Sequence, residues 1–258
     1  MIALGFDTST RATAVGLRLA DATTLQARDD PAPGEHPGHA TRLLGMADAL
    51  LSQAHLPWTD LQRIAVGLGP GRFTGLRVGV ATARGLAQSL AVSLVGVPTL
   101  RALAEPALAS GPGNEQVLAV IDALRGEVFL AGYRAVAGGS PQCALAVPQP
   151  LARNEIADAL RSAAPPRRWL AVGDGAVRYR LDLEAAGALV PADGSSLHLV
   201  QGGTVCELGA RGPAASAHEQ VVPDYRRLAD ARMALATPRP AGGAARPRQP
   251  GPRVGSRP

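Results

Sequence analysis

Hydrophobic positions along the chain alternate between the two-residue repeat of strands and the three-to-four-residue repeat of helices. Ile2, Leu4 and Phe6 alternate with small or polar residues, which predicts a strand at the start of the chain. The same patterns predict strands at residues 13–19, 23–28, 64–68, 91–97, 117–122, 127–133, 144–147 and 169–173, and helices at 39–54, 74–90, 99–104, 154–163 and 195–209. Strands alternating with helices indicate an α/β protein.

The segment after residue 116 repeats the plan of the first residues. Strand, aspartate, turn and strand follow one another at residues 2–19 with Asp7, and again at residues 117–133 with Asp122. We therefore expect a duplicated architecture of two three-layer lobes with mixed sheets. The expected divisions are an N-terminal lobe at 1–108, a second lobe at 109–227 that starts in a Gly/Pro/Ser/Asn break, a segment near 195–227 that packs back on lobe one, and a tail at 228–258.

A glycine-rich loop, Gly69-Pro70-Gly71-Arg72-Phe73-Thr74-Gly75, connects the strand at 64–68 to the helix at 74–90. The loop lacks the chemistry of a Walker A motif, because the chain contains no lysine. It also fails the dinucleotide-binding pattern, because Gly71 and Gly75 are four residues apart where that motif requires three. What remains is the general ability of glycine before a helix N-terminus to hold an anion.

The helix after the loop is apolar over about twice the arc that a single sheet face requires. Beside an apolar stripe of larger residues, the helix has a second stripe of small residues that includes Gly75, Gly79 and Thr82. Its polar face consists only of Arg77, Arg84 and Gln88. Glycine inside a helix costs roughly 1 kcal/mol relative to alanine, so this pair indicates close approach of another backbone. That backbone belongs either to another chain or to a neighbouring helix of the same chain.

Asp7-Thr8-Ser9-Thr10 ends the first strand with a carboxylate and hydroxyls. Such a turn suits phosphate and hydrated Mg²⁺, which makes Asp7, Thr8, Ser9 and Asp122 candidates for a nucleotide site. The alternative is a turn whose side chains bond only their own backbone. His36 and His39 are three residues apart, but no run of carboxylates or cysteines accompanies them and the HExxH pattern is absent, so no metal site is expected.

Composition indicates the cellular environment in which we expect the protein. The 258 residues are 46% hydrophobic, enough for a core, yet arginines interrupt every long apolar run, so no transmembrane segment is expected. The chain enters a strand directly, without the pattern of a signal peptide, and we expect a cytoplasmic protein. Cys143 and Cys206 are expected to be buried apolar residues.

The net charge of +5 resides in the tail. Residues 237–258 contain Arg239, Arg246, Arg248, Arg253 and Arg257 and no acid, which leaves the preceding residues formally neutral. The body is therefore not predicted to be a basic surface. The tail is rich in Pro, Gly, Ala and Arg and is expected to be disordered, with at most a weak, salt-dependent affinity for RNA phosphates.

Several motifs together resemble one family. GPGRFTGLRVGVATARG at 69–85, the opening GFDTST, VLAVIDALRGEVF at 117–129, VGDG at 172–175 and the closing PDYRR are similar to the TsaB (YeaZ) family, over about residues 1–227. That family is the bacterial non-catalytic partner in making N6-threonylcarbamoyladenosine (t6A) at position 37 of tRNAs that read ANN codons. The resemblance implies the duplicated two-lobe fold of actin, Hsp70 and the sugar kinases (ASKHA), in agreement with the repeated plan.

The resemblance also implies partners. They are a TsaD-like catalytic subunit bound through the central helix, a TsaE-like ATPase, a second copy in a homodimer when the chain is alone, and tRNA reached indirectly through the complex. The expected interface residues are Gly71, Phe73, Thr74, Gly75, Val78, Gly79, Thr82 and Leu86. No cofactor, metal or membrane is expected; a vestigial site for ATP or ADP with Mg²⁺, weak or at the interface, is the alternative at Asp7, Thr8, Ser9 and Asp122.

In the catalytic paralogue, TsaD, a helix carries two histidines four residues apart that bind iron. The matching positions here are Thr99 and Leu103, which cannot bind iron, so no catalytic residue is predicted. The competing hypothesis is an enzyme of the same fold, either a small-molecule kinase or a metalloprotease-like protein. The sequence departs from the family at Arg72, where serine is common, and at Pro37-Gly38, YRR and the long tail.

Overall fold

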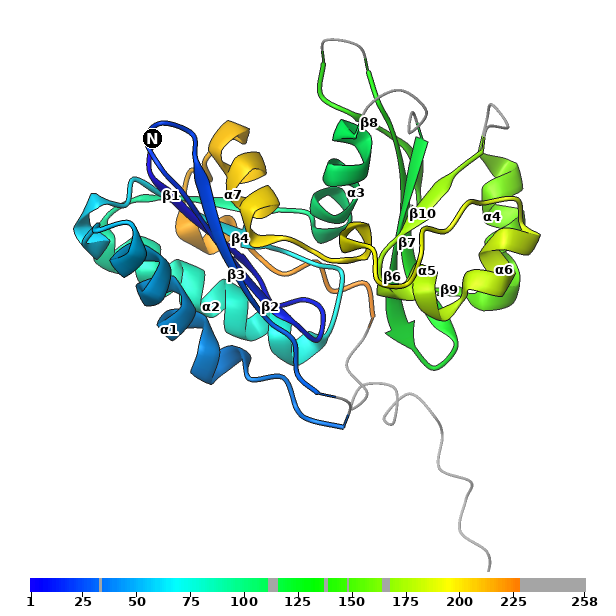
Figure 1. Cartoon of the computed structure of the whole chain (residues 1–258), viewed down its shortest axis with the longest axis horizontal. Helices are drawn as coiled ribbons and strands as arrows, with labels where there is room; N and C mark the ends of the chain where they lie inside the picture. The colour runs from blue at the N-terminus through cyan, green and yellow to red at the C-terminus, as the bar shows by residue number, and fades with distance from the viewer. Residues whose placement is uncertain (33, 111–115, 137–138, 148, 164–167, 228–258) are drawn as a thin grey trace, which may run out of the picture. The chain divides into compact units, whose positions relative to one another are not determined.

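Two mixed β-sheets form the framework of the chain, one built from its first hundred residues and one from the following eighty (Figure 1). The structure is a computed structural model that describes residues 1–227 except 33, 111–115, 137–138, 148 and 164–167. Residues Met1–Arg227 form one compact unit. The predicted lobe boundary at 109–115 falls mostly outside the described residues, as does the tail at 228–258.

The first sheet has the strand order β3-β2-β1-β4-β5. β1 pairs antiparallel with β2 and parallel with β4, which makes the sheet mixed. The bounds are β1 Ala3–Asp7, β2 Thr13–Arg18, β3 Thr24–Asp29, β4 Arg63–Gly67 and β5 Ser93–Val97.

The second sheet has the order β10-β6-β7-β8, with β9 also paired to β7. β6 and β7 form an antiparallel hairpin and β10 runs parallel to β6, which repeats the arrangement of β1, β2 and β4. The bounds are β6 Gln116–Leu124, β7 Glu127–Arg134, β8 Gln142–Ala146, β9 Leu151–Ala152 and β10 Leu170–Val172. The repeated plan confirms the predicted α/β class with duplicated mixed sheets.

Helices cover both faces of each sheet. α1 (His39–Gln53) and α2 (Phe73–Leu90) lie on one face of the first sheet and α7 (Gly202–Arg211) on the other. α3 (Thr99–Ala109) lies on one face of the second sheet, and α4 (Ile156–Ser162), α5 (Asp174–Arg178) and α6 (Arg180–Ala185) pack in the apolar cluster on the other. Short 3₁₀ turns occupy Trp58–Asp60, Arg153–Glu155, Ser196–His198 and His218–Gln220.

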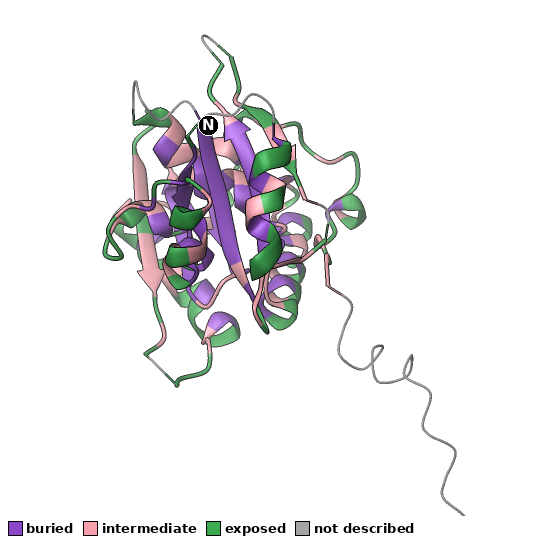
Figure 2. Cartoon of the chain, turned by 90° about the vertical axis from the view of Figure 1, so that its right-hand side faces the viewer, coloured by how far each residue is buried: buried purple, intermediate pink, exposed green. Residues whose placement is uncertain are grey.

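Three apolar clusters stabilise this arrangement. One lies between the first sheet and α1 with α2, one joins α3 and α7 with both sheets, and one lies between the second sheet and α4 to α6. Leu4, Phe6 and Ile64 are fully buried, and burying such a side chain contributes about 1.5–3 kcal/mol relative to exposure. The inner strands are accordingly buried and the outer helix faces exposed (Figure 2).

Two predicted elements differ from the structure. Residues 195–209 do not form one helix: a 3₁₀ turn at Ser196–His198 is followed by extended residues, and α7 begins only at Gly202. α3 continues past the predicted end at Ala104 and through Pro106, because its buried face still packs on the second sheet. α7 contacts β1, β2 and β4, so this late segment of the chain lies on the first sheet.

Candidate functional site

The glycine loop passes directly over the turn that follows β1. The Arg72 amide donates a hydrogen bond of 2.7 Å to the Ser9 carbonyl oxygen, just before α2 begins. A Cβ atom on Gly71 would lie 2.3 Å from the same oxygen, so only glycine fits this crossing. The loop therefore aligns the first turn of α2 with the end of β1.

The glycines inside α2 face the same turn. Gly75 and Gly79 are both buried. A Cβ on Gly75 would lie 1.9 Å from the Thr8 carbonyl oxygen, and one on Gly79 would lie 2.3 Å from the Thr8 hydroxyl oxygen. The expectation that these two glycines line a partner surface is wrong. The close approach that they permit is to a turn of their own chain, which is neither of the helix contacts that the sequence indicated.

The turn at the end of β1 is directed inward. Asp7, Thr8 and Ser9 are at most 1% exposed. Asp7 Oδ1 accepts hydrogen bonds from the Ser9 amide (2.7 Å) and hydroxyl (2.6 Å). The Thr8 hydroxyl donates to the Gly75 carbonyl oxygen at 2.8 Å. These side chains are therefore occupied by the fold, and the prediction that the turn displays them is wrong for all three.

Thr99 completes this buried network. Its hydroxyl donates to Asp7 Oδ2 at 2.6 Å and accepts from the Gly69 amide at 3.0 Å. Thr99 thereby ties the start of α3 to the end of β1 and to the glycine loop. Leu103, one turn further along α3, is 1% exposed in the apolar core. A hydroxyl already engaged and an aliphatic side chain do not fit an iron site.

His39 lies beneath the first turn of α2. It is 5% exposed, and its Nδ1 is 2.9 Å from the Thr13 hydroxyl. Burial lowers the pKa of His39 below 6.5, and Arg72 acts in the same direction, while Asp7 and Asp29 oppose it. Its neighbour His36 is exposed. Within the described residues, no three His, Cys, Asp or Glu side chains gather in a way that could hold a metal ion.

The outward arc of α2 is built from small residues. Thr74, Ala81, Gly85 and Ser89 are exposed and Val78 is half-buried; we call these five residues the outer stripe. A Cβ on Gly85 would meet no atom within 4 Å. Of the predicted interface, the outer stripe includes Thr74 and Val78, and it is bordered by Phe73, Thr82 and Leu86, which are exposed or half-buried.

A segment near the end of the described chain runs along one flank of α2. Arg84 donates to the carbonyl oxygens of Val221 (3.0 Å) and Glu219 (2.6 Å). It therefore binds this segment to α2 and is not part of a free polar face. The Phe73 and Tyr225 rings lie 5.2 Å apart, and Arg77 stacks over Phe73 at 4.0 Å. Phe73 remains 38% exposed and Tyr225 45%. An exposed aromatic pair therefore borders the outer stripe at the start of α2.

In the second lobe, two carboxylates lie together where β6 and β10 end. The Asp122 amide donates to Asp174 Oδ1 at 3.0 Å, and the Asp122 carboxylate accepts from the Leu124 amide and from Arg178. Desolvation raises the pKa of Asp174, and the neighbouring Asp122 charge adds to the effect, whereas Arg72 opposes it. The sequence contained the VGDG motif, but it did not indicate that Asp174 lies beside Asp122.

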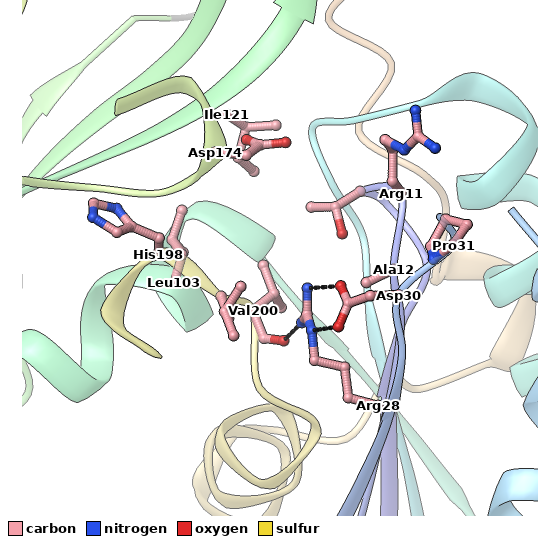
Figure 3. A pocket seen from close by; sticks show the side chains of 12 residues that line it. Arg11, Ala12, Arg28, Asp30, Pro31, Leu103, Ile121, Asp174, His198 and Val200 are labelled. Atoms are coloured by element: carbon pink, nitrogen blue, oxygen red, sulfur yellow. Dashed lines mark hydrogen bonds and ion pairs between the residues drawn. The ribbon is translucent and has the colours of Figure 1, made fainter. Parts of the chain in front are cut away.

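A cavity of about 210 Å³ separates the two lobes at this level (Figure 3). Arg11 and Pro31 line one side, and Asp174 and His198 line the other. Its lining includes neither Asp7 nor Asp122, so the structure does not bring the two predicted aspartates together there. Two carboxylates line the cavity, Asp174 from the second lobe and Asp30 from the first.

Both arginines of the cavity are bound to the protein itself. Arg28 forms a bidentate ion pair with Asp30 and donates to the Val200 carbonyl oxygen at 2.7 Å, which links the two lobes. Arg11 donates to the carbonyl oxygens of Ala32 and Glu35. The cavity therefore does not present a prepared phosphate site, since its guanidinium groups are engaged elsewhere.

Comparison with known proteins finds likenesses to TsaB and TsaD proteins. The family model "TsaD: tRNA N6-adenosine threonylcarbamoyltransferase" matches residues 35–146. The Escherichia coli K12 tRNA threonylcarbamoyladenosine biosynthesis protein TsaB is 38% identical over 131 residues, 51% of this chain and 54% of that protein. The Bacillus subtilis TsaB is 29% identical over 195 residues, 75% of this chain and 81% of that protein. The solved structure of YeaZ from Pseudomonas aeruginosa superposes with a TM-score of 0.66 at 29% identity, covering 86% of this chain and 98% of that one.

These likenesses together support the TsaB family for this chain. The match spans about half the length of the E. coli relative, so the activity and partners of a whole TsaB protein come to this chain only as proposals. The P. aeruginosa structure covers both lobes and supports the predicted duplicated fold. None of the helices in the described part of this chain has the length and apolarity for crossing a bilayer.

Proposed function

We propose that this chain is a non-catalytic subunit in the biosynthesis of t6A in tRNA. It binds a TsaD-like catalytic subunit through the outer stripe of α2 and its aromatic border. The names of its TsaB relatives support the pathway, and the match of residues 35–146 to the TsaD family model supports descent from a common ancestor with the proposed partner.

The observation that carries the proposal is the composition of the outer stripe. Thr74, Ala81, Gly85 and Ser89 have short side chains, and their exposure leaves the α2 backbone accessible over about four turns. Short side chains allow a helix of a second chain to approach closely, so that many backbone and side-chain atoms come into contact. The half-buried Val78 and exposed Phe73 add apolar area, and aromatic residues commonly anchor interfaces.

The same stripe accounts for a homodimer. Two copies of one surface form an isologous contact about a two-fold axis, so a self-complementary α2 face can pair with itself when the partner is absent. In this arrangement the homodimer and the complex with the TsaD-like subunit compete for one surface. Recruitment of a TsaE-like ATPase then depends on the assembled complex, and tRNA is reached through it.

A role without catalysis agrees with the buried network around Asp7. Asp7 would have to release Ser9 and Thr99 before its carboxylate could hold hydrated Mg²⁺, and that change would leave buried donors unpaired at about 1–3 kcal/mol each. Thr99 and Leu103, which align with the iron ligands of the paralogue, do not fit that metal. The vestigial nucleotide site at Asp7, Thr8, Ser9 and Asp122 stays a prediction, and a small-molecule kinase is the alternative function.

Reconstitution separates these functions. Purified TsaD-like and TsaE-like proteins with unmodified tRNA, ATP and an activated threonylcarbamoyl donor should form t6A only when this chain is added, as measured by nucleoside mass spectrometry. The chain alone should hydrolyse ATP no faster than a buffer control, with or without small sugars. Full t6A formation in its absence would contradict the proposal, and ATP turnover by the isolated chain would favour the kinase.

A further inference from the structure

An arginine-lined hollow of about 480 Å³ lies on the second lobe, where α5 and α6 meet the 3₁₀ turn that follows β9. Arg153, Arg178 and Arg180 line it together with Gly126, Leu181 and Asp182. Three guanidinium groups thus share the hollow with one carboxylate. None of these residues belongs to the outer stripe of α2 or to the cavity between the lobes.

Two of the three arginines have capacity for a ligand. The side chains of Arg153 and Arg178 are 59% and 58% exposed. Arg153 forms one ion pair, Nη2 to Asp182 Oδ1 at 3.1 Å, and Arg178 forms one, Nη1 to Asp122 Oδ2 at 3.1 Å. A guanidinium group has five N–H donors, so each retains donors directed to solvent. The acidic partners fix one nitrogen of each arginine and so reduce the entropy lost when an anion binds.

Arg180 has a different role. Its guanidinium donates to Glu184, Asp193 and the carbonyl oxygens of Val190 and Pro191. Its charge is therefore compensated, and it holds the loop after α6 against the hollow. The N–H donors available to a ligand come from Arg153 and Arg178, each of which has only one nitrogen in its ion pair.

We propose that this hollow binds the phosphate backbone of RNA through Arg153 and Arg178. The proposal rests on the proposed function, which supplies an RNA substrate, and it adds a direct contact where the sequence predicted only an indirect one. Guanidinium groups match phosphate geometry, and an open hollow admits a continuous strand where an enclosed pocket would not. Leu181, which is 80% exposed at the rim, offers apolar surface to a ribose or a base.

The arginines of residues 228–258 are a rival source of RNA affinity. The experiment must therefore separate their charges from those of the hollow. We would measure binding of an unmodified tRNA transcript to the full chain by fluorescence anisotropy over a range of salt concentrations. The variants are Arg153→Gln with Arg178→Gln, Arg153→Lys with Arg178→Lys, and a chain that ends at Arg227.

The matched control is Arg161→Gln. Arg161 lies on α4 of the same lobe, is 70% exposed and pairs with Asp158, so the substitution removes one positive charge outside the hollow, half of what the double variant removes. At about 0.1 M salt the double glutamine variant should bind tRNA roughly tenfold more weakly. The slope of log affinity against log salt should fall by roughly 2, one for each lost phosphate contact. The double lysine variant should retain most of the affinity, because a lysine still supplies a cation.

Circular dichroism and a thermal melt establish that each variant is folded. The proposal is overturned if the double glutamine variant matches the parent in affinity and slope, if Arg161→Gln causes an equal loss, or if the chain ending at Arg227 no longer binds tRNA. Pull-down of the TsaD-like subunit should be unchanged in the double variant. The pull-down tests the proposed binding to the TsaD-like subunit separately from the RNA site, so either hypothesis can fail without the other.

Discussion

The two faces of α2 carry glycines for opposite reasons. Gly75 and Gly79 lie on the inner face, where an added Cβ would overlap Thr8 at 1.9 and 2.3 Å. Gly85 lies on the outer face, where an added Cβ would meet nothing within 4 Å. The inner pair is explained by the fold of one chain, whereas the outer glycine has no such explanation within the described residues. A small residue in a helix therefore indicates a partner only when the space beside it is empty.

This comparison relocates the proposed interface. The sequence assigned the close contact to the stripe containing Gly75 and Gly79, which the structure shows to be buried. The stripe that remains available is rotated around the helix and includes Thr74, Val78 and Gly85. The hypothesis that α2 is the contact element stays a proposal, but the residues that should be changed to test it are different.

The largest expected effect is on folding. Gly79→Arg should prevent the chain from folding, because the new side chain has no room beside Thr8. Even Gly75→Ala should lower the free energy of unfolding by about 3 kcal/mol, since the overlap is with a backbone oxygen. Denaturant titration would measure the change. Gly85→Ala is the control, and it should stabilise the protein by up to about 1 kcal/mol through helix propensity; equal behaviour of the two alanine variants would contradict the comparison.

The second prediction concerns partner binding. Gly85→Arg should remain folded, because its side chain enters open space. It should weaken binding of the TsaD-like subunit by about 100-fold, roughly 3 kcal/mol, because a charge would be buried unpaired in the contact. It should also convert a homodimer to a monomer on size exclusion.

Gly194→Arg is the matched control for this measurement. Gly194 is also exposed with nothing within 4 Å of an added Cβ, but it lies in a loop of the second lobe. It should bind the partner normally. Unchanged binding by Gly85→Arg, measured by titration calorimetry, would remove the outer stripe from the interface.

The third prediction tests the network that holds the inner face. Thr99→Val keeps the side-chain shape but leaves Asp7 Oδ2 and the Gly69 amide without the threonine hydroxyl. The free energy of unfolding should fall by about 2–3 kcal/mol, since both groups are buried. Thr74→Val, at an exposed position of α2, should change it by less than about 0.5 kcal/mol. A similar result for both variants in urea titrations would argue against a structural role for Asp7.

The smallest expected effect is a pH dependence at His39. Burial holds its pKa in the folded state below the value of 6.5 that it takes when unfolded. As the pH falls below about 6.5, the unfolded chain takes up the proton first, so the free energy of unfolding decreases until the pH passes the folded pKa. Well above pH 6.5 His39 is neutral in both the folded and the unfolded chain, so it does not change the free energy of unfolding with pH. Thermal melts between about pH 7.5 and 5 should show that Tm decreases less in His39→Gln than in the parent. The control is His36→Gln, which changes an exposed histidine and should behave like the parent.

Local pattern was sufficient to predict most elements. The strands and helices follow from two-residue and three-to-four-residue periodicity, and the repeat of strand, aspartate, turn and strand predicted the duplicated sheets. Patterns were less informative where packing decides the conformation. Residues 195–209 look helical throughout, yet the extended residues before α7 are required to bring that helix onto the first sheet.

The sequence by itself predicted the fold class and showed the resemblance to TsaB, because both depend on motifs of residues close together along the chain. Tertiary structure alone decided which side of α2 is free and whether the Asp7 turn is displayed. The deciding contacts join Thr8 to Gly75 and Asp7 to Thr99, pairs that are 67 and 92 residues apart. Periodicity identifies an apolar or small face, but only the positions of distant residues show whether the same chain already covers it.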